Sequence, residues 1–234
     1  MKKADNPQGD KEKFIPLTLQ EIHEATEQRI EKIQQEFSAG FKLIEQHPQS
    51  VTFFGSARLS EDHPSYKDAQ HLASAIVSTL GYSVLTGGGP GIMEAANKGA
   101  KLGGGSSIGL NISIPFEQFV NKWVDPELAF EFHYFFMRKF WFVYLAKAFI
   151  IFPGGFGTLD ELMEVLTLIQ TGKLKKKMKL IIYDSNYWKR IINFDALIED
   201  GVISKSDLKL FDFCDTVDEA YEKVIKHMQK NYVK

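Results

Sequence analysis

The sequence has a single cysteine, Cys214, among its 234 residues. One cysteine excludes an internal disulfide framework and a cysteine-only metal cluster, and it suits a reducing compartment such as the cytoplasm. We interpret Cys214 as an inert residue of an apolar strand. A charge imbalance is lacking too, because 28 Lys and Arg against 30 Asp and Glu give a formal net charge of −2. We therefore expect no general attraction to nucleic acid or to an anionic membrane, and partners must be predicted from local sites.

Long uninterrupted hydrophobic runs are lacking as well. The longest apolar stretch, 130–152, is broken by residues that a bilayer core would not readily accept. These are Glu131, His133, Arg138, Lys139 and Lys147. Residues 1–13 are polar and charged, so we predict no secretory signal there and interpret 1–16 as a flexible tail. We expect a soluble chain without membrane contact.

Between positions 19 and 44, apolar residues recur at alternating spacings of three and four, which is typical of an amphipathic helix. They are Leu19, Ile22, Thr26, Ile30, Ile33, Phe37, Phe41 and Ile44. We predict a helix over 17–48 that ends at Pro48. Two interpretations stay open, because the apolar stripe could pack on its own domain or form a contact between subunits.

From residue 49 onward, short apolar runs alternate with helical stretches. The runs 51–54, 83–86, 107–112, 148–152 and 180–183 are nearly continuous in apolar residues, which predicts strands buried on both faces. Helices are expected near 66–80, 92–102, 135–147, 159–171, 187–198 and 218–231. This order predicts one α/β domain over 49–234 with a doubly wound parallel sheet. Such sheets bind ligands beyond the carboxyl ends of their strands, where the strand order reverses.

Glycine-rich turns follow three of the expected strands, at 55–58 (GSAR), 87–91 (GGGPG) and 153–158 (PGGFGT). Glycine lets consecutive N–H groups point into one concavity, and a following helix N-terminus adds partial positive charge, so both features favour a phosphate. The second turn lacks the spacing of the dinucleotide fingerprint, and neither larger turn has the Lys-Ser or Lys-Thr of a nucleoside-triphosphate loop. A monophosphate fits better. The alternative is that these glycines only make tight turns.

Three charged residues are candidates for chemistry. Glu161 follows Thr158 at capping-box spacing, so it either caps a helix or stabilises positive charge developing on a ribose. Glu164 lies one helical turn later on the same face, where a second carboxylate could share the site. Arg138 begins an aromatic-rich helix, and it either pairs with a carboxylate across a subunit contact or holds a nucleotide and balances the charge of Glu161.

The run 153–161, PGGFGTLDE, matches at every fixed position the PGGxGTxxE signature of the LONELY GUY family of cytokinin-activating phosphoribohydrolases. The runs 87–95 and 137–139 also resemble that family, and the resemblance covers about 51–171. It implies a Rossmann-like fold and homodimers or larger homo-oligomers. The implied reaction is hydrolysis of adenosine 5′-monophosphate, plain or N6-substituted, to free base and ribose 5-phosphate, with no metal or organic cofactor.

Carried over residue by residue, the resemblance implies that Arg138 and Glu161 form a catalytic pair. The substrate-binding residues that we expect are Ser56, Gly88, Gly89, Met137, Lys139, Gly155, Gly157 and Thr158. The long N-terminal helix and the extended C-terminal segment depart from the compact members and resemble the longer bacterial branch.

Two other functions stay open. One keeps the reaction and broadens the substrate to ordinary purine nucleoside monophosphates. The other is a module that senses or carries a nucleotide without turnover, because fold does not determine function. Family members were long labelled lysine decarboxylases, but that reaction usually needs pyridoxal phosphate on a Schiff-base lysine, and no lysine here has a recognisable context for one. The lysine-rich run 173–179 is expected to be a solvated loop, and the six histidines lack the spacing of a zinc site.

Overall fold

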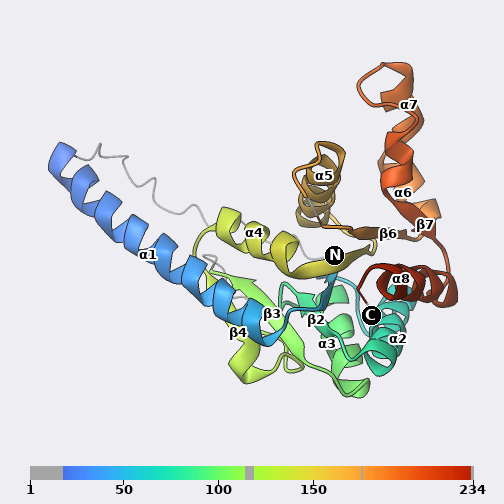
Figure 1. Cartoon of the computed structure of the whole chain (residues 1–234), viewed down its shortest axis with the longest axis horizontal. Coiled ribbons are helices and arrows are strands. Elements are labelled where there is room, and N and C mark those ends of the chain that lie inside the picture. Colours follow the sequence, from blue (N-terminus) through green and yellow to red (C-terminus); the bar gives the residue numbers. More distant parts are fainter. Residues whose placement is uncertain (1–17, 114–118, 175, 233–234) are drawn as a thin grey trace, which may run out of the picture.

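A computed structural model describes residues 18–113, 119–174 and 176–232, so the predicted tail over 1–16 lies outside the described residues. Seven strands form one wholly parallel sheet in the order β4-β3-β2-β1-β5-β6-β7 (Figure 1). They are β1 (Ser50–Phe54), β2 (Ser83–Thr86), β3 (Ser107–Ile112), β4 (Ala129–Phe132), β5 (Ala146–Ile151), β6 (Lys179–Tyr183) and β7 (Asp212–Cys214). The predicted doubly wound parallel sheet is confirmed.

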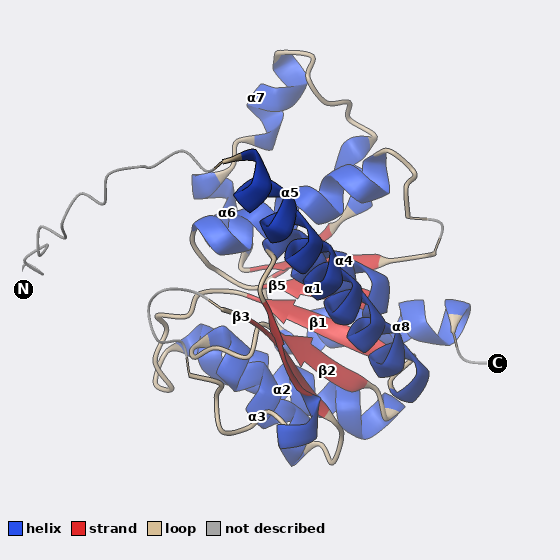
Figure 2. Ribbon diagram, turned by 90° about the vertical axis from the view of Figure 1, so that its left-hand side faces the viewer, coloured by secondary structure: helices blue, strands red, loops and turns tan. Residues whose placement is uncertain are grey.

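Helices cover both faces of this sheet (Figure 2). They are α1 (Leu19–Gln46), α2 (Pro64–Leu80), α3 (Ile92–Leu102), α4 (Phe135–Leu145), α5 (Phe156–Gln170), α6 (Ser185–Ile191), α7 (Phe194–Glu199) and α8 (Val217–Asn231), with short 3₁₀ turns at Pro126–Leu128 and Asp207–Leu210. One core lies between the sheet and α2, α3 and α8, and the other lies between the sheet and α4, α5, α6 and the end of α1. None of the described helices has the length and apolarity to cross a bilayer.

The central strands contribute to both cores. In β5, Ala148 and Ile150 pack toward α2, α3 and α8, whereas Phe149 and Ile151 pack toward α4 and α5. All four side chains are fully buried. Because neighbouring side chains of a strand point to opposite faces, a strand covered on both sides needs apolar residues at nearly every position. This explains the nearly continuous apolar runs.

The two edge strands and one helix differ from the predictions. β4 was not predicted, because Ala129 and Glu131 are exposed and the strand lacks a continuous apolar pattern. β7 has only three residues, too few to show a period. The helix predicted over 187–198 is wrong, because the chain is extended at Ile192 and starts again as α7, which the side chain of Asn193 caps.

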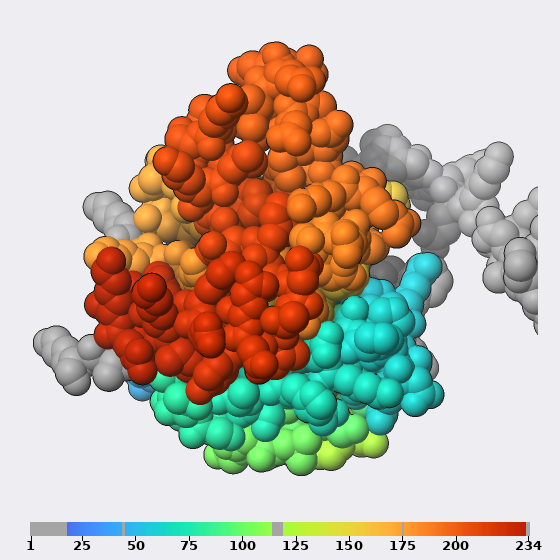
Figure 3. Space-filling model, turned by 90° about the vertical axis from the view of Figure 1, so that its right-hand side faces the viewer, coloured from blue at the N-terminus to red at the C-terminus, as the bar shows by residue number. Residues whose placement is uncertain are grey.

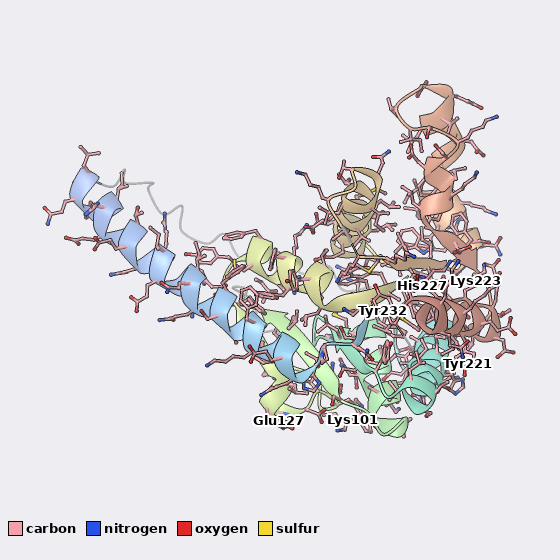
Figure 4. All side chains as sticks on the ribbon, in the orientation of Figure 1. Lys101, Glu127, Tyr221, Lys223, His227 and Tyr232 are labelled. Carbon is pink, nitrogen blue, oxygen red and sulfur yellow. The ribbon has the colours of Figure 1, made fainter. Side chains whose placement is uncertain are left out.

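The C-terminal helix α8 closes one face of the sheet. Tyr221 lies on this helix and Tyr232 directly follows it (Figure 4). The Tyr221 hydroxyl lies 2.8 Å from Thr79 Oγ1 on α2, and the Tyr232 hydroxyl donates to the Lys177 carbonyl. Cys214 in β7 is fully buried beside α8, as predicted for an inert strand residue. Burial raises the pKa of its thiol to about 11, which keeps it protonated and unreactive at neutral pH.

Helix α1 begins at a capping box formed by Thr18 and Glu21 and extends well beyond the sheet (Figure 1). Its C-terminal half packs on α4, where the rings of Phe37 and Phe41 lie 5.3 and 5.1 Å from the ring of Trp141. Packing on its own domain is therefore confirmed for this half. In the other half, Leu19, Ile22 and Ile30 are exposed. A subunit contact through those residues stays a prediction.

Gly40 sets how closely α1 approaches α4, because a Cβ atom there would overlap the buried indole of Trp141. Replacing glycine by alanine inside a helix normally stabilises a protein by about 0.5–1 kcal/mol. We predict the opposite sign for Gly40→Ala, a loss of roughly 1–3 kcal/mol from overpacking. Denaturant unfolding would measure it, with exposed Ser38→Ala as the control. Equal or greater stability of Gly40→Ala would contradict this packing.

Candidate active site

A cleft opens where the strand order reverses. β1 and β5 are neighbours in the sheet although β2, β3 and β4 separate them in the chain, so their following loops diverge to opposite sides. The Ser56 N–H donates to the Pro153 carbonyl at 2.9 Å and holds the two loops together at their start. Beyond this bond lies a cleft of about 1060 Å³. Its place matches the ligand-binding crevice of doubly wound sheets.

The cleft brings together six of the residues predicted from the sequence. Ser56, Arg138, Gly155, Gly157, Thr158 and Glu161 line it. Gly88, Gly89, Met137 and Lys139 do not belong to its lining. Met137 is 4% exposed and packs in the core beneath α4, so the structure places it behind the site.

The turn after β5 leads directly into α5. Gly155 is the N-cap of this helix, no side chain caps it, and the first helical bond runs from the Leu159 N–H to the Gly155 carbonyl. The three preceding N–H groups therefore have no helical acceptor, and they form a site for an anion. A Cβ atom on Gly155 or Gly157 would meet nothing within 4 Å, so the protein leaves this space to the cleft.

This helix start also corrects the capping-box alternative. α5 begins at Phe156, two residues before Thr158, so Thr158 is not the N-cap and Glu161 lies in the second turn. The side chain of Glu161 does not cap the helix. The sequence pattern suggested a later start because glycines, which have low helix propensity, occupy the first turn.

Helix α6 supports the same turn from the other side. The Tyr187 hydroxyl donates to the Gly154 carbonyl at 2.7 Å, and Asp184 accepts from the Tyr187 N–H at 3.0 Å. Asp184 has a left-handed backbone with a φ of 71°, which is uncommon for a residue with a side chain. Both residues line the cleft and were missed from the sequence. Their position just after β6, at the carboxyl edge of the sheet, was the available signal.

The triple-glycine turn is held by a buried polar network rather than by the cleft. The Asn121 side-chain amide nitrogen lies 3.1 and 3.0 Å from the carbonyl oxygens of Gly88 and Gly89 and 2.9 Å from Asn97 Oδ1, so its two hydrogens are shared among three acceptors. Thr86 Oγ1 accepts from the Gly88 N–H at 2.9 Å. The sequence did not reveal this network, because its members come from separate elements. It fixes the turn behind the cleft.

Gly87 and Gly91, at the two ends of that turn, have different roles. Gly87 lines the cleft, and a Cβ atom there would crowd the sulfur of Met93 and lie 3.7 Å from a terminal nitrogen of Arg138. Gly91 has a φ of 70°, and its missing side chain lets the Ser56 carbonyl approach closely and accept from the Ile92 N–H at 3.0 Å. Gly91 thus joins α3 to the loop after β1.

Arg138 extends from the first part of α4 into the cleft. Its guanidinium carbon lies 5.4 Å from the ring centre of Phe135 and 5.5 Å from that of Phe142, within cation–π range of both. Its Nε atom is buried without a hydrogen-bond partner among the described residues. Burial lowers the pKa of Arg138, while Glu161 and Asp160 act in the opposite direction. Arginine stays charged in proteins, so the site holds a fixed cation with donors available to a ligand.

Glu161 faces this cation from α5. It is only 4% exposed, and its Oε2 atom has no hydrogen-bond partner among the described residues. Burial raises the pKa of Glu161 to about 7, with smaller contributions from Glu164 and Asp160, although Arg138 and Lys139 favour the charged form. A carboxyl group with a pKa near neutrality in a cleft is typical of an active site.

Lys139 connects the two helices beside this pair. Its ammonium lies 2.6 Å from Asp160 and 3.3 Å from Glu164, both on α5. These ion pairs join the neighbours of Arg138 and Glu161 and hold the two helices in register. Glu164 therefore pairs with Lys139 and does not share the cleft, contrary to the prediction from its helical spacing.

The remaining lining is largely apolar and includes Phe54, Leu59, Met93, Ile112 and Phe142. A planar, partly apolar ligand group suits such walls. Among the described residues, no lysine lines the cleft, and no three His, Cys, Asp or Glu side chains are placed to hold a metal ion.

Comparison with known sequences identifies a single family. A family model described as "Possible lysine decarboxylase" matches residues 93–224, more than half of the chain. A cytokinin riboside 5′-monophosphate phosphoribohydrolase of Arabidopsis thaliana is 31% identical over 155 residues, which cover 65% of this chain and 69% of that protein. A probable enzyme of the same name from Oryza sativa is 28% identical over 184 residues, covering 77% and 84%.

Comparison with solved structures gives the fold. A molybdenum cofactor binding protein from Rippkaea orientalis superposes with a TM-score of 0.54 at 20% identity, covering 76% of this chain and 94% of the neighbour. The molybdenum cofactor carrier protein of Chlamydomonas reinhardtii gives 0.50 at 21% identity, covering 77% and 96%. At such identities the likeness extends to the fold alone.

The ion pairs of Lys139 generate a prediction about Glu161. Because the charge of Lys139 favours the ionised carboxylate, Lys139→Gln should raise the pKa of Glu161 above about 7. A ¹³C NMR titration of carboxyl-labelled glutamate would measure the pKa, with the signal assigned by its loss in Glu161→Gln. Lys42→Gln on exposed α1 is the control and should leave the pKa unchanged. A lower pKa in Lys139→Gln would contradict the geometry.

Proposed function

The chain belongs to the LONELY GUY family of cytokinin riboside 5′-monophosphate phosphoribohydrolases, and from its cleft we propose that it hydrolyses the N-glycosidic bond of a nucleoside 5′-monophosphate. The substrate that we propose is adenosine 5′-monophosphate, plain or substituted at N6, and the products are the free base and ribose 5-phosphate. The observation that carries this proposal is the buried carboxyl group of Glu161, which faces Arg138 one helical turn beyond an anion-binding turn.

The spacing along α5 suits a ribose 5-phosphate. The phosphate binds the free N–H groups at the start of α5, in the open space above Gly155 and Gly157. Glu161 follows Gly157 by four residues, or about 6 Å along the helix axis. That rise places its carboxylate beside the sugar when the 5′-phosphate lies at the helix start. The base then extends along the apolar walls of the cleft.

The reaction exchanges one bond for another at C1′ of the ribose. The bond from C1′ to the base nitrogen breaks and its electron pair leaves with the base, while a water oxygen forms a new bond to C1′. One water proton stays on the new hydroxyl, and the other is transferred to the departing base. Positive charge develops on the ribose along this path, as in other glycosidic cleavages.

Each member of the pair has a distinct task. The Glu161 carboxylate stabilises the developing positive charge and accepts a hydrogen bond from the attacking water. Arg138 donates to the nucleotide and keeps part of the Glu161 population ionised despite burial. Because the cleft is partly apolar, both electrostatic effects are stronger there than in water.

The cleft gives no support to lysine decarboxylation. A pyridoxal-dependent reaction requires a lysine that reaches the cofactor, and no lysine lines the cleft in the described part of the chain. Lys139, which lies nearest to the pair in sequence, is engaged by Asp160 and Glu164.

Product analysis tests the proposal and its main alternative. We expect the purified protein to release base and ribose 5-phosphate from adenosine 5′-monophosphate or from its N6-isopentenyl form. Glu161→Gln should keep nucleotide binding and lose about 10²–10⁴-fold in turnover. Glu199→Gln, an exposed change on α7, is the matched control. Unchanged turnover in Glu161→Gln would refute the mechanism, and binding without any turnover by the unaltered protein would favour a carrier.

A second variant tests where the phosphate lies. Gly157→Ala adds a methyl group that meets no protein atom but enters the proposed phosphate space. We predict equal or slightly higher thermal stability, because alanine favours a helix over glycine, together with a KM raised at least about tenfold, a loss of roughly 1.4 kcal/mol in binding. The control is Ala39→Ser on α1. A second glycine such as Gly172 is not used, because its φ of 67° would itself strain an alanine. An unchanged KM would place the phosphate elsewhere.

A further inference from the structure

Helix α4 carries Arg138, and backbone groups at its ends have no hydrogen-bond partner within the helix. Tyr134 precedes it as the N-cap and makes no side-chain capping bond. At the other end, β5 begins at Ala146 directly after the last helical residue, Leu145. The Ala146 N–H donates to the Phe142 carbonyl, but the chain then continues as a strand and does not turn back toward the carbonyls of Val143 and Tyr144. The last carbonyls of α4 therefore depend on a group from elsewhere.

Just before the N-terminal end, α1 holds the backbone segment that leads into α4. Glu36 Oε1 accepts from the His133 N–H at 2.7 Å, across nearly one hundred residues of sequence. Glu36 is 5% exposed, and its Oε2 has no hydrogen-bond partner among the described residues. A buried carboxylate in such surroundings is costly unless a positive charge or dipole offsets it. The positive end of the α4 dipole, which begins two residues after His133, provides that offset.

At the C-terminal end, the group comes from the segment between α5 and β6. The Lys176 ammonium donates to the carbonyls of Val143, Tyr144 and Ala146, at 2.7, 2.6 and 2.6 Å. Burial and the charge of nearby Lys147 lower the pKa of Lys176 to about 7. Three carbonyl acceptors favour the protonated form, since only the ammonium has three N–H donors. A cation at a helix C-terminus also has the favourable sign for the dipole.

We propose that Glu36 and Lys176 are positioning residues that hold α4 at its two ends and thereby fix the Arg138 guanidinium in the cleft. The inference rests on the proposed function, because it assigns the two residues a part in the same reaction. It also gives the added helix α1 a task in the active site. Neither residue touches the cleft, so both act through Arg138.

Arg138 is sensitive to the position of α4 because little else holds its guanidinium. Its ring contacts come from Phe135 and Phe142, which lie on α4 itself and move with it. Core packing of Trp141 and Phe142 and the ion pairs of Lys139 also hold α4, so loss of Glu36 or Lys176 is expected to shift the helix by a small distance. A displacement of about 1 Å in an active site can lower the rate by about a hundredfold.

The experiment compares Glu36→Ala, Glu36→Gln and Lys176→Met in the full-length protein. Glu36→Gln keeps an oxygen that accepts from His133 and is expected to restore most of the activity lost in Glu36→Ala. Exposed Glu45→Ala and Lys177→Met are the matched controls. We expect kcat to fall roughly 10- to 100-fold in Glu36→Ala and Lys176→Met, with KM within about threefold of its original value.

A double-mutant test separates positioning from general stability. If Glu36 acts through Arg138, adding Glu36→Ala to an Arg138→Lys protein should lower kcat by less than about twofold further. A kcat that stays unchanged in a folded Glu36→Ala protein, or effects that multiply in the double mutant, would overturn the inference. If Glu36→Ala fails to fold, the same comparison with Lys176→Met decides it.

One readout does not depend on turnover. The Arg138 Nε–H signal in ¹⁵N NMR reports the surroundings of the guanidinium, and it should shift in Glu36→Ala and Lys176→Met but not in Glu45→Ala. An unaltered protein that releases no base would refute the proposed function, while this shift would still support the positioning of Arg138. An active protein whose signal does not shift in either variant would refute the positioning alone.

Discussion

A nearly buried carboxyl group beside a partly buried arginine is the constraint on which the rest of the site depends. Glu161 loses most of its hydration, and this burial raises its pKa to about 7. That balance changes steeply with the distance to Arg138 and Lys139, since Coulomb interactions are strong where water is excluded. The surrounding architecture is therefore organised to keep α4 and α5 in fixed relation. The ion pairs of Lys139 with Asp160 and Glu164 join the two helices directly beside Arg138 and Glu161.

Much of the fold could be predicted because its central strands are covered on both faces. Val51–Phe54 and Ala148–Phe152 read as strands from apolarity alone, and the reversal of strand order predicted where a ligand binds. The edges could not be predicted in the same way. β4 has exposed residues in alternation with buried ones, and β7 is too short for any period. The break at Ile192 was hidden because apolar residues continue through it into α7.

The site also contains some residues that could be predicted from the sequence and others that could not. Residues that lie within one continuous motif, such as Gly155, Gly157, Thr158 and Glu161, were identified together and line one cleft. Motif membership did not distinguish residues that face a ligand from residues that hold the motif in place. Gly88 and Gly89 belong to the second kind, and the amide of Asn121 that holds them is distant in sequence. Long-range hydrogen bonds of this kind leave no periodic signal, so only the folded arrangement reveals them.

The direct passage from α4 into β5 limits how the cleft can move. Because α4 passes into a central strand without a loop, the junction itself leaves little room for movement of the wall that carries Arg138. The opposite wall is different. Helices α6 and α7 stand out from the body above α8 (Figure 3), and α6 reaches the turn after β5 through the Tyr187 hydroxyl. We expect the movement that admits a nucleotide or releases a base to come from that projecting side, and the rate of product escape would then be a property of α6.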